Sequence, residues 1–132
     1  MNADMSFSFR REPHTLGWGE CHRLSLELLK ELYFLLRKIP KSELDTVRNC
    51  KRAGKSIPTN IAEGWAKRSY EAVFKNHLKI CIGSSDEVVS HLRTIVITVP
   101  RQEEDAKILA EKYKVLSRRL NKLHKVWKSD KF

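Results

Sequence analysis

The stretch FKNHLKICIGSSDEVVSHLRTIVITV, residues 74–99, decides the fold. Apolar or small residues recur in it every three or four positions, a spacing that places them on one face of an α-helix. These residues are Phe74, Leu78, Cys81, Ser85, Val88, Leu92, Ile95 and Val99. Ser69 is the expected cap of this helix, and roughly 28 residues would make it about 42 Å long. We expect Gly83, Ser84 and Ser85 in its middle to let a neighbouring backbone approach closely.

The same spacing predicts a helix on either side of this stretch. After it, Pro100 can open a helix, with Glu103, Glu104 and Asp105 in the first turn, where the helix dipole favours acids. The apolar residues of that helix are Leu109, Tyr113, Leu116, Leu120, Leu123 and Trp127. Before it, residues 42–68 carry the row Val47, Cys50, Gly54, Ile57, Ile61 and Trp65. Ser42 and Asp45 resemble a capping box at its start, and Pro58 predicts a kink between Gly54 and Pro58.

A further helix is predicted over residues 19–38 and has two apolar rows. The first row is Cys21, Leu24, Leu28, Leu32, Leu35 and Ile39, and the second is Leu26, Leu29, Tyr33 and Leu36. A helix with two apolar rows is covered on two sides. We therefore assign the first row to the core and the second row to contact with a partner subunit, because a monomer would leave it as an exposed patch.

Four helices of similar length with short connections predict an all-α, antiparallel, up-down-up-down four-helix bundle. The expected organisation is a flexible tail over residues 1–18, the bundle over 19–128 and a short C-terminal tail over 129–132. The residues expected to meet in one core are Phe74, Leu78, Val88, Leu92, Leu116 and Leu120.

Charge and cysteine content narrow the class of function. Lys and Arg number 26 against 16 Asp and Glu, which gives a formal charge of +10. Such a field attracts polyanions, chiefly nucleic acid or an acidic membrane surface, although it also serves solubility. No apolar run approaches the roughly 20 residues of a membrane helix, and no signal peptide is visible. Three widely spaced cysteines indicate neither a disulfide framework nor a zinc knuckle, so we expect a cytoplasmic protein.

Two basic rows are the candidate phosphate contacts. The last helix has seven bases and no acid between residues 112 and 128. Like charges this close repel one another, and phosphates would relieve that repulsion; the alternative is an ordinary solvated face. The residues assigned to nucleic acid are Arg48, Lys51, Lys55, Arg118, Arg119, Lys122 and Lys125. If both rows faced one side of the bundle, they would form a charged belt.

A second group, Arg52, Asn60, Glu63 and Glu87, has two interpretations. These residues could serve acid–base or metal chemistry, but a nuclease usually needs more clustered carboxylates. We favour a buried polar network that fixes helix register, in which Arg52 pairs with Glu63 or Glu87. His77 and Cys81 are one turn apart, yet two ligands do not make a zinc site. The sequence therefore predicts no metal, no cofactor and no catalytic site.

Residues 56–64, SIPTNIAEG, resemble the signature of the four-helix-bundle family encoded in intervening sequences of bacterial large-subunit ribosomal RNA genes. Four shorter segments support the resemblance: Ile39-Pro40, Arg52-Ala53, residues 83–87 and residues 116–123. The resemblance implies a bundle that assembles into a ring, often a pentamer. It is also similar in fold to the accessory protein of diversity-generating retroelements, which binds reverse transcriptase and RNA.

Three hypotheses about function follow. The first is a non-enzymatic, oligomeric nucleic-acid-binding protein, with RNA favoured over DNA by the genomic setting of the family. The second is a protein-interaction scaffold, or an accessory subunit for an RNA-bound enzyme such as a reverse transcriptase. The third, an RNA-processing enzyme, is the least favoured because no catalytic constellation is visible.

Overall fold

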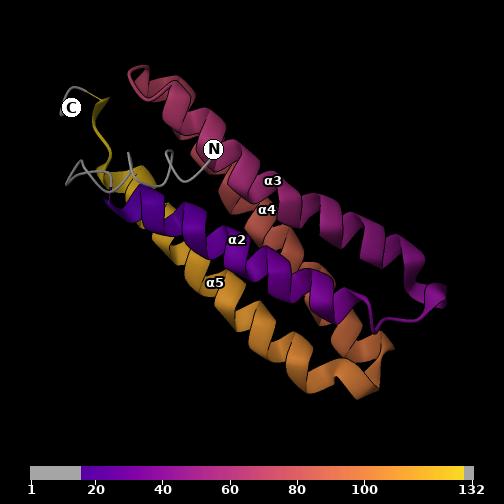
Figure 1. Ribbon diagram of the computed structural model, residues 1–132. Coiled ribbons are helices and arrows are strands. Elements are labelled where there is room, and N and C mark those ends of the chain that lie inside the picture. Colours follow the sequence, from indigo (N-terminus) through magenta and orange to yellow (C-terminus); the bar gives the residue numbers. More distant parts are fainter. Residues whose placement is uncertain (1–15, 130–132) are drawn as a thin grey trace.

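The computed structural model describes residues 16–129, and these residues are almost entirely helical (Figure 1). Four α-helices follow one another: α2 (Leu16–Leu36), α3 (Leu44–Ala66), α4 (Glu71–Thr98) and α5 (Glu103–Val126). Two short 3₁₀ turns, η2 (Lys41–Glu43) and η3 (Pro100–Gln102), stand before α3 and α5. The connections are so short that each helix reverses direction relative to the previous one, which confirms the antiparallel bundle.

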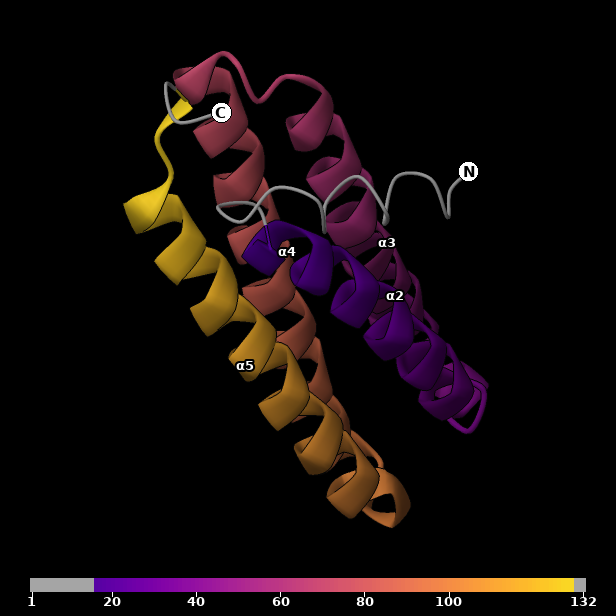
Figure 2. The ribbon, with the colours of Figure 1, turned by 60° about the vertical axis from the view of Figure 1, so that its left-hand side comes forward.

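The helices occupy the four corners of a bundle in chain order. Each helix packs against its neighbours in sequence, and α2 also packs against α5, which closes the bundle. In Figure 2, α3 and α5 lie on opposite sides of the molecule, with α2 and α4 between them. The outward faces of α3 and α5 therefore point in opposite directions.

The predicted core is confirmed. Its six members, Phe74, Leu78, Val88, Leu92, Leu116 and Leu120, are all fully buried. One end of this core is closed by aromatic rings: Trp18 lies 4.7 Å from Phe74, and Phe74 stacks on Trp127 at 4.2 Å between ring centroids. Each such ring pair stabilises the fold by about 0.5–1.5 kcal/mol beyond its burial.

The helix ends differ from the predictions. Because α2 begins at Leu16, Trp18 belongs to the core and not to a tail; the rest of the predicted tails, residues 1–15 and 130–132, lies outside the described residues. Neither predicted cap forms. The N-cap of α3 is Glu43 and that of α4 is Tyr70, and neither makes a side-chain capping hydrogen bond. A 3₁₀ turn satisfies the start of α3 instead, with the Glu43 N–H donating to Pro40.

The close approach of a neighbouring backbone expected at Gly83, Ser84 and Ser85 occurs at Ser85, whose hydroxyl donates to the Tyr113 carbonyl of α5 over 3.0 Å, but not at Gly83. A further close contact lies at Gly54. Gly83 is exposed, and a β-carbon there would have nothing within 4 Å, whereas one on Gly54 would lie 2.8 Å from Leu32 and 3.1 Å from Leu29. The missing side chain thus lets α2 approach α3. Pro58 lies inside α3, which continues through it without interruption.

The assignment of Leu36, in the second apolar row of α2, to a partner subunit is wrong. Leu36 is only 3% exposed and lies in the core of its own subunit. Leu29 packs against that core, and the half-buried Tyr33 is covered by Lys51, whose Nζ lies 4.9 Å from the ring centroid. Only Leu26 remains exposed, because α3 covers this side of α2.

Candidate nucleic-acid interface

The two predicted basic rows do not form one belt. Arg48 and Lys55 are exposed on α3, whereas Arg118, Arg119, Lys122 and Lys125 are exposed on α5. Since α3 and α5 occupy diagonal corners, their outer faces point away from each other (Figure 2). Lys51 also turns toward α2, over the ring of Tyr33. The one-sided arrangement that the sequence suggested is therefore wrong for a single subunit.

Helix α5 divides into a paired half and an unpaired half. Three lysines in its first half form ion pairs: Lys107 with Glu103 at 2.7 Å, Lys112 with Glu31 at 2.9 Å and Lys114 with Glu111 at 3.2 Å. Farther along, four exposed bases form no ion pair with any carboxylate of the described residues: Arg118, Arg119, Lys122 and Lys125. Positive charge on this half is therefore available to an external anion.

Helix α4 adds a base that the sequence did not reveal. The hydroxyl of Ser117 on α5 donates to Asp86 on α4 over 2.8 Å, which fixes the level at which the two helices meet. Because α4 and α5 run antiparallel, His124, seven residues after Ser117, lies level with Lys79, seven residues before Asp86. The pKa of His124 is lowered by burial first, and then by the charges of Lys75 and Lys79. Lys79 is exposed and without an ion pair among the described residues, whereas Lys75 is bound to Glu71 at 3.4 Å.

These residues define one surface at the end of the bundle where α5 finishes. We call it the basic surface: Lys79, Arg118, Arg119, Lys122 and Lys125. The expected antiparallel packing of the last two helices was the signal that could have placed Lys79 there. The register of these two helices could not be predicted from the sequence, because the contact that fixes it, between Ser117 and Asp86, joins one helix to the other.

The predicted polar network exists in a different form. Asn60 accepts a hydrogen bond from His77 Nδ1 at 2.9 Å and donates to Ser56 Oγ at 3.2 Å, while Ser84 donates to Ser56 at 3.0 Å. This chain of contacts joins α3 to α4, as a register-fixing network should. Ser56, His77 and Ser84 were not among its predicted members.

The charged members of the predicted network lie at the surface. Arg52 pairs with Glu87 as proposed, but at 3.8 Å and with side chains 73% and 44% exposed, so the pair is not buried. Glu63 is exposed and forms no ion pair with a described residue. Its assignment to a buried network is wrong, since it lies on the outer side of α3. An exposed pair of this kind adds little stability.

The cysteines are buried among apolar side chains. Burial raises the pKa of Cys21, Cys50 and Cys81 to about 12 each, so all three remain neutral thiols at ordinary pH. Within residues 16–129, no group of three or more His, Cys, Asp or Glu side chains is placed to hold a metal ion. No helix in that part of the chain is long and apolar enough to cross a membrane.

The comparison with protein families matches this architecture. The model of the family described as 23S rRNA-intervening sequence protein matches residues 20–122, which include the 56–64 signature, all of α3 and all of α4. No curated protein matches the chain. Since the family model covers well over half of the 132 residues, the chain belongs to the 23S rRNA-intervening sequence protein family.

Proposed function

We propose that this protein binds nucleic acid, RNA in preference to DNA, through the basic surface and without catalysing a reaction. The observation that carries the proposal is the contrast within α5. Lysines up to Lys114 are neutralised by carboxylates, whereas Arg118, Arg119, Lys122 and Lys125 are exposed and unpaired within the described chain. Phosphates that bind these side chains release condensed counterions, which favours binding.

Recognition on this surface is through phosphates and not through bases. Base stacking needs exposed aromatic rings. Tyr70, just before α4, is 69% exposed, but the aromatic side chains within α4 and α5, Phe74 and Tyr113, are fully buried, and so is Trp127 after α5. Binding should therefore be weakly sequence-specific and strongly dependent on salt. The preference for RNA is supported by the family, whose name ties it to intervening sequences of 23S rRNA.

We also propose that the protein forms a homo-oligomer, since the family resemblance implies a ring, often a pentamer. Symmetry would repeat the basic surface in every subunit, so that weak contacts to one long RNA add up. The alternative function is that of a scaffold or an accessory subunit for an RNA-bound enzyme such as a reverse transcriptase. Exposed apolar residues on α4 favour it: Val73 and Ile80 are seven residues apart on one face, and Tyr70 precedes them.

A filter-binding titration tests the proposal. Single-stranded RNA and DNA of the same sequence are titrated with the full chain at low and at moderate salt. We expect RNA to bind at low salt and to be released steeply as salt rises, with a slope of about 0.7 for each phosphate neutralised. If no RNA binds even at low salt, the basic surface is only a solvated face and the scaffold function replaces this proposal.

A further inference from the structure

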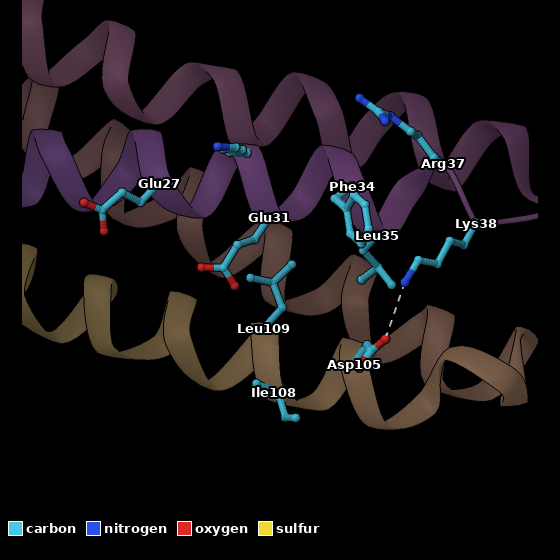
Figure 3. A pocket seen from close by; sticks show the side chains of 10 residues that line it. Glu27, Glu31, Phe34, Leu35, Arg37, Lys38, Asp105, Ile108 and Leu109 are labelled. Atoms are coloured by element: carbon cyan, nitrogen blue, oxygen red, sulfur yellow. Dashed lines mark ion pairs between the residues drawn. The ribbon is translucent and has the colours of Figure 1, made fainter.

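A groove of about 830 Å³ runs between α2 and α5, at the other end of the bundle from the basic surface (Figure 3). Its floor includes the buried residues Leu35 and Leu109. Phe34 and Ile108 line it from the two helices and remain 59% and 50% exposed. The Nζ of Lys38 lies 4.6 Å from the centroid of the Phe34 ring and covers part of it. At least half of each apolar side chain still lies in water beside an apolar floor, which is costly unless something covers it.

The charges around this groove cancel. Its lining contains three acids, Glu27, Glu31 and Asp105, and three bases, Lys30, Arg37 and Lys38. The whole chain carries +10, whereas the lining of this groove carries no net charge. A polyanion is not attracted to a region without net charge. A second copy of this positively charged chain is repelled by most of the surface, but it can approach this region without net electrostatic repulsion.

The charges are also sorted along α2 and the turn that follows it. Glu27 and Glu31 lie toward one end of the groove, Arg37 and Lys38 lie toward the other, and Phe34 stands between them (Figure 3). Lys30 is the exception to this order. Two of the sorted charges already have partners, since Glu31 accepts from Lys112 at 2.9 Å and Lys38 lies 3.8 Å from Asp105.

Glu27 and Arg37 remain for an external partner. Both are exposed, and neither forms an ion pair with another described residue. The residue midway between them is position 32, which is about 3 Å along the helix axis from Phe34. An acid and a phenylalanine on α2, and a base in the turn directly after α2, therefore follow one another along the lining of this groove.

We propose that this face, which we call the Phe34 face (Glu27, Phe34, Arg37 and Ile108), binds a second copy of the chain about a two-fold axis. Two α2 helices would lie antiparallel, so Glu27 of each copy would meet Arg37 of the other. The two Phe34 rings would lie beside the axis and cover each other's groove. A two-fold contact uses the same surface on both copies, and only a self-complementary charge pattern supports it.

This inference goes beyond RNA binding and does not depend on it. The Phe34 face uses the first half of α5, whereas the basic surface uses the second half, so RNA and a second copy can bind at the same time. It is also distinct from a ring, whose contact is head-to-tail. If a ring forms through another surface, the two-fold contact joins two rings.

The first test measures the mass of the full chain by sedimentation equilibrium, for the wild type and two variants. Phe34→Asp places a charge beside the axis and should halve the mass of the assembly. Ile97→Asp is the matched control, because Ile97 is 79% exposed on α4 and lies away from the groove. Its mass should equal that of the wild type. If the wild type is still monomeric at about 1 mM, the free energy of dissociation is below about 4 kcal/mol and the proposal is wrong. So does an unchanged mass for Phe34→Asp.

The second test separates two-fold pairing from any other contact. In the proposed dimer, residue 27 of each copy meets residue 37 of the other, so each single variant, Glu27→Arg or Arg37→Glu, creates two contacts between like charges. Each variant should weaken association on the order of tenfold. In an equimolar mixture of the two variants, the mixed dimer restores both opposite-charge pairs, so the mixture should associate more tightly than either variant alone. If the mixture is no tighter, the two helices do not pair antiparallel and the proposal fails. Circular dichroism spectra that match that of the wild type show that all variants are folded.

Discussion

A β-carbon on Gly64 of α3 would lie 3.0 Å from the β-carbon of His77 on α4. It would also lie 3.2 Å from the ring of Trp18. Neither neighbour can easily move, because the His77 ring is hydrogen-bonded to Asn60 at 2.9 Å and Trp18 is fully buried against Phe74. The glycine that ends the family signature thus lets α2, α3 and α4 meet closely at this level.

Gly64→Ala should therefore destabilise the bundle. Overpacking of this kind costs about 1–3 kcal/mol, which outweighs the gain in helix propensity. Gly83→Ala is the matched control within α4, where a β-carbon meets nothing within 4 Å, and it should raise the free energy of unfolding by about 0.5–1 kcal/mol. Urea denaturation followed by circular dichroism measures both. Equal effects of the two substitutions would contradict this account.

A second pair of variants tests the core on α4. Leu92→Ala removes a fully buried side chain and should lower the free energy of unfolding by about 2–5 kcal/mol. Ile97→Ala, on the same helix, removes a side chain that is 79% exposed and should change it by less than about 0.5 kcal/mol. A loss at Leu92 as small as that at Ile97 would mean that the inner face of α4 is assigned wrongly.

The inner faces of the helices could be predicted from the sequence, but their ends could not. Burial along α4 follows the period of the helix, so Phe74, Leu78 and Leu92 were identified by spacing alone. The caps depended on single polar residues. At the start of α3 a 3₁₀ turn takes the place of the predicted cap, and α4 begins after its N-cap, Tyr70, without a side-chain cap.

Only the part of the candidate site that lies on a single helix, α5, could be predicted from the sequence. The exposed row from Arg118 to Lys125 follows from the spacing of apolar residues on α5. The addition of Lys79 and the separation of α3 from α5 are relations between helices, which no single periodicity encodes. The assignment of Leu36 failed for the same reason, since a second apolar row shows that a helix is covered twice but not by which neighbour.

The buried thiols make stability depend on alkaline pH. In the folded chain the pKa of Cys50 and Cys81 is about 12, whereas the ordinary value that the unfolded chain should show is 9.0. Above pH 9 the unfolded state therefore loses protons that the folded state keeps, so stability falls as pH rises from about 9 toward 12. Cys50→Ala should make this fall shallower, as measured by urea denaturation at pH 8 and pH 10. An identical slope in the variant would contradict the assignment.

His124 should report on charge at the basic surface. Its pKa is held below the ordinary 6.5 by burial and by the charges of Lys75 and Lys79. Lys79→Gln removes one of these charges and should raise the pKa, and bound RNA should raise it further by neutralising the lysines. An NMR titration of the imidazole protons measures both effects. His22, whose pKa is lowered by burial, is the internal control and should not respond to Lys79→Gln.

The contrast between the two halves of α5 leads to the sharpest test of RNA binding. Arg118→Gln with Arg119→Gln removes two exposed charges without a carboxylate partner in the described chain. Lys107→Gln with Lys112→Gln removes two charges from the same helix that are bound to Glu103 and Glu31. Both double variants lower the net charge of the chain by the same amount. They therefore separate local phosphate contact from the overall field.

We expect the arginine pair alone to reduce the salt dependence of RNA binding. Each lost contact to a single strand should lower the slope of log affinity against log salt by about 0.7, so the pair should lower it by up to about 1.4. All RNA sequences should weaken about equally, because no base is read. The lysine pair should leave the slope close to that of the wild type. If both pairs reduce affinity equally and neither changes the slope, the RNA responds only to the net charge of the protein, and the basic surface is not a binding site.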